Sequence, residues 1–515
     1  MHASRPFGVA IAIVVGFCAA PARARIDWSN ITNVNAWFQN GANWVGGVAP
    51  GAAATARFSL NNTYQVWWDS TTPVQTPSVK FLKMPIGNVE FVNQDAGPQY
   101  ELIVNGSGGV GAQSDLSISN PATVLTLRGV HLHSLGGAEL LSKATVTLDG
   151  SHPAGAKLTV DGGAGLRISG DLSVVAGGIF NSSSTVFVGN FGSGSAGISG
   201  AGSRWNSNLL YVGGTGGNGA LNIAAGGIVT IGSSASIVVS PGSTGTATVT
   251  GTGSQWNVAD ELWVGPVGAG TLIVRDNGLV SASDLSIGSF GRLTGDGTIV
   301  ANVTSDGTIA PGNSPGTLHI DGNYTQAAAG KLEIELASAA SFDRLDISGA
   351  AALNGSLDVA LYNGFQPHTG DFFADIYSAG SVTGAFGSVT GTNLGGGLLL
   401  NPISAASSLS LLAALPGDAN LNRTADFTDL GILLNNYNST GFSGIAQWNA
   451  GDFNDDHAVN FTDLGILLNN YNQHAPLAAA NASVPEPSTL LLAVVALCGV
   501  GYARRHRLFR AIIAN

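Results

Sequence analysis

Two Asp- and Asn-rich loops near the C-terminus carry the residue types that bind hard metal ions. The run GDANLNRTAD at 417–426 precedes FTDLGILLNNYN, and the run GDFNDDHAVN at 451–460 precedes a second, identical FTDLGILLNNYN. Oxygen-only ligands favour calcium over zinc or copper. Ligand positions recur at 1, 3, 5, 7, 9 and 12, and they are Asp418, Asn420, Asn422, Thr424, Asp426 and Asp429 in the first loop and Asp452, Asn454, Asp456, Ala458, Asn460 and Asp463 in the second. The sequence therefore predicts two Ca²⁺ sites.

This spacing is typical of an EF-hand-type loop, in which the residue at position 7 contributes its backbone carbonyl. Position 6 of such a loop normally holds glycine, because the chain turns there with a positive φ. Here it holds Arg423 and His457. A residue other than glycine costs about 1 kcal/mol at such a position, so we expect moderate affinity for calcium.

The repeated FTDLGILLNNYN stretch predicts a short helix after each loop. Leu430, Leu433, Leu434 and Tyr437 fall at i, i+3, i+4 and i+7, which places them on one helical face. Two copies can pack these faces against each other and form a small core. We expect chelation of calcium to unfold residues 417–472 and to leave the preceding domain intact.

Residues 417–472 resemble a type I dockerin, with an Asp at position 12, a single following helix and a tandem copy. The resemblance implies a calcium-dependent module that docks into a cohesin-like protein. Phe427 and Thr428, and again Phe461 and Thr462, stand about where dockerins present partner-reading residues, so the two faces should be interchangeable. The alternative is a calcium-stapled cap that binds no partner.

The chain before these loops consists of short apolar bursts separated by turn residues. Gly contributes 73 of 515 residues, and alternating stretches such as KATVTLDG indicate short strands joined by tight turns. GAGSRWNSNLLYVG and GTGSQWNVADELWVG place Trp205 and Trp256 51 residues apart, and VFVG and LYVG divide the unit into coils of about 25 residues. A fixed short period predicts a right-handed β-helix or a close relative, whereas a β-sandwich with irregular repeats would not explain the register.

These coils resemble the repeats of autotransporter passenger domains and of PEP-CTERM proteins. The segment LTGDGTIVANVTSDGTIAPGNSPGTLHIDGNYTQ is similar to the C-terminal part of such passengers, and the resemblance covers about residues 36–390. The chain departs from autotransporters where it continues into the duplicated loops instead of an outer-membrane barrel.

Both ends of the sequence carry targeting patterns. Arg5, the apolar run that follows it and Ala22-Arg23-Ala24 indicate a Sec signal peptide at 1–24. Residues 484–507 place Pro-Glu-Pro, an apolar run and an arginine cluster in the order of a PEP-CTERM sorting signal. The resemblance implies cleavage by an exosortase-type enzyme and temporary insertion in the inner membrane. An ordinary C-terminal anchor is the alternative.

The charge and cysteine content restrict the partners. Without 1–24 and 488–515, the chain loses six of its 20 basic residues and none of its 32 acidic residues, which leaves a net charge of −18. Such a body should repel nucleic acid and attract divalent cations. Cys18 and Cys498 lie in the terminal segments, so neither a disulfide nor a cysteine metal site is expected between them.

No residue of the repeats is predicted to be catalytic. Glu333 and Glu335 share a strand face, as do His131 and His133, but such pairs are usually solvated faces. Trp205, Trp256 and Trp263 could form a ladder for sugar rings or could fill the coil interior. Five further tryptophans should cap the open end of the solenoid, and these are Trp28, Trp37, Trp44, Trp67 and Trp68.

We therefore expect a mainly β fold, a right-handed β-helix or solenoid followed by a small α-helical, tandem EF-hand-like module. The expected domains are a signal peptide at 1–24, an N-terminal β region and cap at 25–130, β-solenoid repeats at 131–310, a passenger-like β region at 311–413, a dockerin-like calcium module at 414–474, a linker at 475–483 and a sorting signal with a transmembrane segment at 484–515. The expected function is that of an exported, non-enzymatic protein of the cell surface or extracellular polysaccharide matrix. The alternatives are a polysaccharide-degrading β-helix enzyme with a docking module, and a scaffold that recruits a cohesin-bearing partner.

Overall fold

The computed structural model describes residues 144–161 and 165–475 without interruption, together with shorter N-terminal stretches. These stretches are 25–27, 36–37, 43–44, 49, 55–58, 63–68, 78–79, 81–84, 88–93, 100–104, 116–118, 124–128, 130–135 and 138–140. The predicted signal peptide, the sorting signal at 484–515 and all but the first residue of the predicted linker lie outside the described residues.

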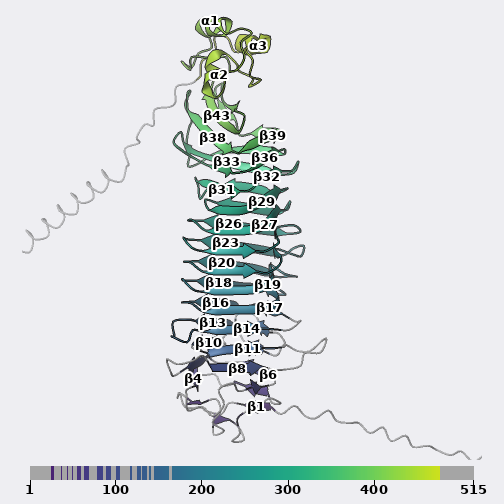
Figure 1. Ribbon diagram of the computed structural model, residues 1–515. Helices are drawn as coiled ribbons and strands as arrows, with labels where there is room; N and C mark the ends of the chain where they lie inside the picture. The colour runs from purple at the N-terminus through teal and green to yellow at the C-terminus, as the bar shows by residue number, and fades with distance from the viewer. Residues whose placement is uncertain are drawn as a thin grey trace, which may run out of the picture.

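The described strands form two sheets, one of 16 strands and one of 27 strands. Figure 1 shows that they stack along a single axis, with the helices at the C-terminal end of the stack. Almost all neighbouring strands are parallel, and each turn adds one strand to the smaller sheet and two strands, or one long strand, to the larger sheet. The fold is therefore a mainly β, parallel β-solenoid, which confirms the solenoid prediction and rules out the β-sandwich.

The smaller sheet contains one strand per turn and one antiparallel extension. Its strands are β2 (Ala36–Trp37), β4 (Thr63–Trp68), β7 (Asn88–Asn93), β10 (Val124–Arg128), β13 (Thr145–Asp149), β16 (Asp171–Val175), β18 (Gly194–Ser199), β20 (Asn218–Ala224), β23 (Thr244–Thr250), β26 (Ala269–Arg275), β28 (Gly291–Gly295), β30 (Thr308–Pro311), β33 (Lys331–Ser338), β34 (Ser341–Phe342), β37 (Ser356–Leu361) and β40 (Ser388–Thr390).

The larger sheet covers the other sides of each turn. Its strands are β1 (Arg25–Asp27), β3 (Thr55–Arg57), β5 (Ser78–Val79), β6 (Phe81–Met84), β8 (Tyr100–Val104), β9 (Leu116–Ile118), β11 (Val130–Ser134), β12 (Ala138–Leu140), β14 (Lys157–Val160), β15 (Leu166–Ile168), β17 (Ile179–Val188), β19 (Arg204–Val212), β21 (Ile228–Ile231), β22 (Ala235–Ile237), β24 (Gln255–Val258), β25 (Glu261–Val264), β27 (Leu279–Ile287), β29 (Thr298–Ser305), β31 (Thr317–Asp321), β32 (Tyr324–Gln326), β35 (Arg344–Ile347), β36 (Ala350–Leu353), β38 (Phe372–Ser378), β39 (Ser381–Gly384), β41 (Asn393–Gly395), β42 (Leu398–Ser404) and β43 (Ser408–Ala414).

The apolar residue of each alternating pair points into the solenoid and stacks on its counterpart in the next turn. Leu172, Ala196, Leu221, Ala247 and Leu272 pair in register along the smaller sheet, and all of them are buried. Each turn thus covers the apolar face of its neighbour, which no single coil could bury alone.

A column of glycines marks the corner where each turn enters the smaller sheet. Gly194, Gly219, Gly245 and Gly270 pair in register, 25 or 26 residues apart. A Cβ atom on Gly219 would lie 2.2 Å from the Gly213 nitrogen. The corner is too tight for a side chain, so the glycine period follows the length of the coil.

Gly219→Ala should destabilise the solenoid by about 3 kcal/mol, because the new methyl group meets backbone atoms that cannot move independently. Gly197→Ala, in the neighbouring strand β18, is the matched control, since its Cβ would have no atom within 4 Å. Denaturant midpoints measure both changes. Equal midpoints for the two variants would contradict the steric role of the glycine column.

The parallel stack ends in an antiparallel hairpin. Strand β43 pairs antiparallel with β42 and with β38. Ile403, Leu412 and Ala414 of this hairpin belong to a hydrophobic cluster that also contains Leu433 and Trp448 from the helical segment. The segment after β43 is therefore continuous with the end of the solenoid through a shared core.

Asp343 is a carboxylate buried inside the solenoid. Its Oδ1 accepts a hydrogen bond from the Gly316 N–H at 2.9 Å, and its Oδ2 accepts one from the Glu335 N–H at 2.9 Å. Burial raises the pKa of Asp343 to about 6, although the two backbone donors favour the charged form. The folded state therefore binds the proton more tightly than the unfolded chain, whose Asp pKa is about 3.9.

Asp343 should make the solenoid less stable as the pH rises from about 4 to about 6. The contribution to the free energy of unfolding is up to about 3 kcal/mol. It is fully present below the pKa of the unfolded state, about 3.9, and it is lost as the pH rises through the pKa of the folded state, about 6. Asp343→Asn should remove this dependence, and it should also lose one of the two backbone hydrogen bonds. Denaturant midpoints of both proteins between pH 4 and pH 7 give the difference, and parallel curves would refute the assignment.

Three helices follow the last strand, and they are α1 (Phe427–Asn435), α2 (Ile445–Ala450) and α3 (Phe461–Asn469). No helix in the described part of the chain is long and apolar enough to cross a membrane.

Candidate metal centre

The two predicted ligand loops each end in a hydrogen-bonded helix start. Asp426 caps α1 and Asn460 caps α3, and each accepts a hydrogen bond from a backbone N–H of the first helical turn. Asp429 and Asp463 complete both capping boxes by accepting from the backbone N–H of the capping residue. The position-12 carboxylate of each loop is therefore held by the helix that follows it.

Asp418 and Asp429 form the buried part of the first loop, and neither is exposed to solvent. Asp429 Oδ1 accepts hydrogen bonds from the N–H groups of Ala419 and Asn420 at 3.0 and 3.1 Å, and Asp418 Oδ2 accepts one from Arg423 N–H at 2.6 Å. The loop backbone thus wraps around its first and last carboxylates.

The other predicted ligands of the first loop contact the loop backbone or a neighbouring side chain. Asn420 Oδ1 accepts from Asn422 N–H at 3.0 Å, Asn422 Oδ1 from Thr424 N–H at 2.9 Å and Asp426 Oδ1 from Thr428 N–H at 2.7 Å, while Thr424 Oγ1 lies 2.9 Å from His474 Nδ1.

The second loop brings three carboxylates together. Oxygens of Asp452, Asp456 and Asp463 lie within 4.8 Å of one another, the only such group of three potential ligand residues among the residues that the structure describes. Asp452 Oδ2 is buried and has no hydrogen-bond partner. A divalent cation fits this position, because it would supply the partner that Asp452 lacks and offset the charge of three neighbouring acids.

Asn454, Ala458 and Asn460 lie around the same carboxylates. The side-chain amides of Asn454 and Asn460 donate to Asp456 Oδ2 at 2.9 and 3.1 Å, and Ala458 N–H donates to Asp456 Oδ1 at 3.0 Å. All twelve predicted positions therefore lie in the two loops, with the tighter carboxylate cluster in the second.

The acids of the two loops differ in their preference for the charged form. Burial, together with the nearby Asp429 charge, raises the pKa of Asp418 to about 6, although backbone hydrogen bonds oppose the shift. Burial and the charges of Asp463 and Asp456 also raise the pKa of Asp452. By contrast, the hydrogen bond from the Asn454 side chain lowers the pKa of Asp456. The inner carboxylates are costly to ionise without a cation, and the outer one is not.

Position 6 has the backbone conformation expected of a calcium loop. Arg423 has a φ of 75° and His457 a φ of 62°. Both residues occupy the left-handed region that glycine adopts at lower cost. The loops therefore turn as predicted, with a strained residue at the turn.

Sequence reasoning missed the residues that attach the loops to the rest of the protein. Trp448, in α2, is buried and donates from Nε1 to the carbonyl oxygen of Asp418 at 2.8 Å. Both carboxylate oxygens of Asp455 accept from Ser404 N–H, at 2.9 and 3.0 Å, and Gln447 Nε2 also donates to Asp455. Asp455 follows no ligand spacing, so only the tertiary contact reveals its role.

The predicted apolar face of the helices is wrong in part. Leu433 is buried, and Leu430 packs against the same cluster, but Leu434 is 54% exposed and Tyr437 36% exposed. The helix is rotated so that Asp429 faces inward beside Leu433, which turns the edge of the apolar stripe toward solvent. The second copy has the same arrangement.

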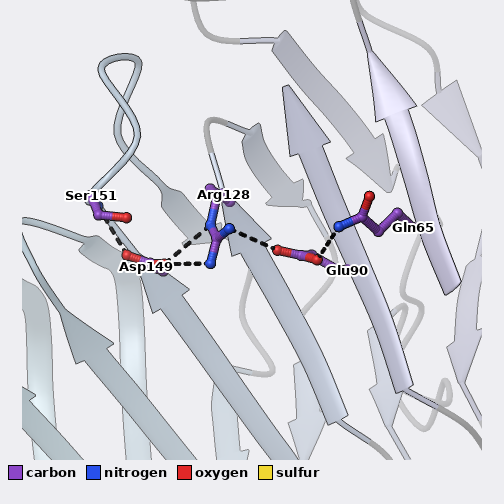
Figure 2. Close-up of polar contacts among 5 residues, drawn as sticks. All are labelled: Gln65, Glu90, Arg128, Asp149 and Ser151. Carbon is purple, nitrogen blue, oxygen red and sulfur yellow. Dashed lines mark hydrogen bonds and ion pairs between the residues drawn. The ribbon is translucent and has the colours of Figure 1, made fainter. Parts of the chain in front are cut away.

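Several charged residues on the outer face of the solenoid pair with one another. Figure 2 shows Arg128 between Glu90 and Asp149, with Arg128 Nη2 2.9 Å from Asp149 Oδ2 and Nη1 3.4 Å from Glu90 Oε1. The pKa of Asp149 lies below its ordinary value, because hydrogen bonds from Ser151 and Arg128 outweigh its partial burial. A general acid in glycoside hydrolysis needs a raised pKa, which Asp149 lacks.

One residue of each pair named in the sequence analysis, Glu333 and His131, has a partner in another coil. Glu333 Oε2 lies 2.7 Å from Arg292 Nη1. The imidazole of His131 lies between Glu101 Oε1, at 3.1 Å, and Thr159 Oγ1, at 2.8 Å. The side chain of His133 lies outside the described part of the molecule. The His131 contacts join neighbouring coils, and the Glu333 contact reaches across one intervening coil, so both support the stacking.

The predicted outward-facing ladder of tryptophans is wrong for two of the three residues. Trp205 and Trp256 are fully buried inside the coils, where Trp205 packs edge-on against Phe180 at 4.9 Å between ring centroids. Trp263 faces outward and is half-buried. The interior interpretation therefore holds for Trp205 and Trp256.

Of the tryptophans expected to cap the solenoid, Trp44 is buried and its ring centroid lies 5.4 Å from that of Phe58. Trp37 and Trp67 pair in register between β2 and β4. Trp28 and the side chain of Trp68 are not among the described parts.

Comparison of the chain with protein-family models and with curated proteins finds no match. Its function must therefore be inferred from its own residues.

Proposed function

We propose that this chain is an exported structural or adhesive protein of the cell surface or extracellular matrix. In this proposal the β-solenoid is a rigid spacer, and the C-terminal segment is a tandem EF-hand-like, dockerin-like module that binds two calcium ions. The C-terminal sequence 484–515 would direct processing by an exosortase-type enzyme after transient insertion in the inner membrane.

The observation that carries the proposal is the burial of two carboxylates in each copy of a duplicated loop. Asp418 and Asp429, and again Asp452 and Asp463, are at most 1% exposed. Uncompensated buried carboxylates are strongly destabilising. Calcium, when bound, would supply the compensating charge, and the side chains of each loop would supply the oxygen ligands.

The surface of the helices supports a docking role. Phe427 is 74% exposed, and its counterpart Phe461 is 75% exposed. Leu434 and Leu468 are also exposed in both copies, at 54% and 55%. Phe427 and Leu434 stand at i and i+7 of α1, and Phe461 and Leu468 repeat this spacing in α3. An exposed apolar pair on one helical face, present in both copies, favours a protein partner such as a cohesin-like domain over a cap without a partner.

Calorimetric titration of the full chain with calcium tests the proposal. We expect two sites per chain, and Asp463→Asn should eliminate the second site while leaving the first. Asp306→Asn, an exposed acid in the solenoid, is the matched control and should retain both sites. Absence of binding at millimolar calcium would refute the proposed module.

Arg423→Gly should bind calcium about fivefold more tightly at the first loop, because it removes about 1 kcal/mol of left-handed strain. Arg423→Ala is the control, since it removes the positive charge but keeps a Cβ at the strained position. Titration of both variants separates the two effects. An affinity gain in the alanine variant equal to that in the glycine variant would assign the effect to charge instead of backbone strain.

Capture by an immobilised type I cohesin domain tests the docking surfaces. We expect Phe427→Ser and Phe461→Ser to bind when tested singly and the double variant to lose binding, because either copy can serve. Phe191→Ser, an exposed phenylalanine of the solenoid, is the control. Calcium binding without any capture would favour the capping role and leave the calcium sites in place.

A further inference from the structure

Three aromatic side chains lie in one row on the outer face of the 27-stranded sheet. Phe187 pairs in register with Tyr211, Tyr211 with Ser236, and Ser236 with Trp263. Neighbouring strands are about 4.8 Å apart, so the row from Phe187 to Trp263 extends about 14 Å along the solenoid axis. None of the three rings belongs to the interior column that contains Trp205 and Trp256.

Two rings of the row are in contact, and the third stands two strands further along. The ring centroids of Phe187 and Tyr211 are 5.2 Å apart, and all three aromatic side chains are half-buried. Ser236 stands in the row between Tyr211 and Trp263, yet it is only 4% exposed. Its small side chain lies between two larger ones in register, which leaves the aromatic rings as the accessible surface.

The surroundings of the row are polar but carry little charge within it. Ser286 and Thr304 continue the row beyond Trp263, and Arg167 precedes Phe187. Beside the row, Glu261 Oε1 accepts a hydrogen bond from Ser286 Oγ at 2.9 Å. From Phe187 to Thr304 the row itself contains no charged residue, and hydrogen-bonding groups stand at its end and side.

We propose that this row binds a linear, uncharged polysaccharide that runs parallel to the solenoid axis. Sugar rings present apolar C–H faces, which can stack on Phe187, Tyr211 and Trp263, and they carry hydroxyl groups at their edges, which Glu261 and Ser286 can bind. The acidic chain, with a net charge of −18 once both terminal segments are excluded, disfavours polyanionic glycans and nucleic acids. The inference rests on the proposed matrix association but is independent of the calcium loops.

The test is retardation of the full chain in native gels that contain hydroxyethylcellulose, xyloglucan or alginate, each with calcium and with chelator. Trp263→Ser and Tyr211→Ser are the variants, because serine already occupies the neighbouring register positions 236 and 286 and is compatible with the strand. Phe290→Ser, 61% exposed and outside the row, is the matched control. Thermal unfolding of each variant establishes that it is folded.

We expect a neutral polymer to retard the wild-type chain both with and without calcium. Either row variant should bind the polymer about tenfold more weakly. Binding to alginate alone, unchanged binding in both folded row variants, or equal loss in Phe290→Ser would overturn the proposal. A self-association of the wild-type chain that Trp263→Ser abolishes, without polymer binding, would also overturn it in favour of a second copy. The calcium titration does not depend on this row. A negative result in the polysaccharide gels therefore leaves the proposed calcium module standing, and a negative calcium titration leaves the proposed polysaccharide site standing.

Discussion

Removal of calcium should expose the last hairpin of the solenoid, in addition to unfolding the helical segment at 417–472. The hairpin residues Ile403 and Leu412 share a core with Trp448. Asp455, in the second loop, accepts two hydrogen bonds from Ser404 N–H of β42. The expectation from sequence, that chelation leaves the whole solenoid intact, therefore needs revision at β42 and β43.

Hydrogen exchange with and without chelator measures this effect. Amides of β42 and β43 should exchange at least about tenfold faster without calcium, since a hydrogen bond to a charged group contributes about 1.5–3 kcal/mol and the one from Ser404 to Asp455 is partly buried. Amides of β20 and β23 should be unchanged. Asp455→Ala is the matched variant, because it removes the contact to Ser404 and no predicted ligand.

In the presence of calcium, Asp455→Ala should accelerate exchange at Ser404 while both calcium sites still titrate. Full protection of β42 and β43 in chelator would show that the hairpin is stable without the helical segment. That outcome would restore the simpler prediction of an independent module.

Trp448→Ala should unfold most of the C-terminal segment even when calcium is present. Trp448 is 1% exposed, its ring centroid lies 5.0 Å from that of Phe453, and its Nε1 donates to the Asp418 carbonyl oxygen. Loss of such a side chain costs about 3–5 kcal/mol. A segment of this size has a total stability of about 5 kcal/mol, so little would remain.

Trp448→Phe is the control that separates packing from hydrogen bonding. It keeps an aromatic ring but loses the donor to Asp418, which should cost about 1–3 kcal/mol. Calorimetric unfolding should show a separate, lower transition for the C-terminal segment in Trp448→Phe and no such transition in Trp448→Ala. A wild-type transition in Trp448→Ala would show that the Trp448 contacts to Asp418 and Phe453 do not hold the C-terminal segment together.

The repeat length, the solenoid and the positions of the two loops could be predicted from the sequence, because each depends on local patterns. The glycine column recurs every 25 or 26 residues, since the coil must turn a tight corner once per turn. Helix starts at Phe427 and Phe461 follow from the capping residues before them. The left-handed backbone at Arg423 and His457 follows from the length of the loop.

Which aromatic residues face outward depends on the fold of each coil. Trp205 and Tyr211 are six residues apart, so strict alternation would place them on the same face of a strand. The chain turns a corner between them within β19, and Trp205 points inward while Tyr211 points outward. Within a straight strand, successive side chains alternate between the two faces. Which face is buried after a corner depends on how the coil closes around the core.

The attachment of the loops to the solenoid likewise could not be predicted from the sequence. Asp455 and Ser404 are separated by 51 residues, yet they form direct hydrogen bonds. No local pattern specifies this pairing, because it depends on how the last hairpin and the second loop pack around Trp448. The candidate ligand spacing could be predicted because it lies within twelve consecutive residues of each loop, whereas the contact that couples the second loop to the solenoid exists only once the chain has folded.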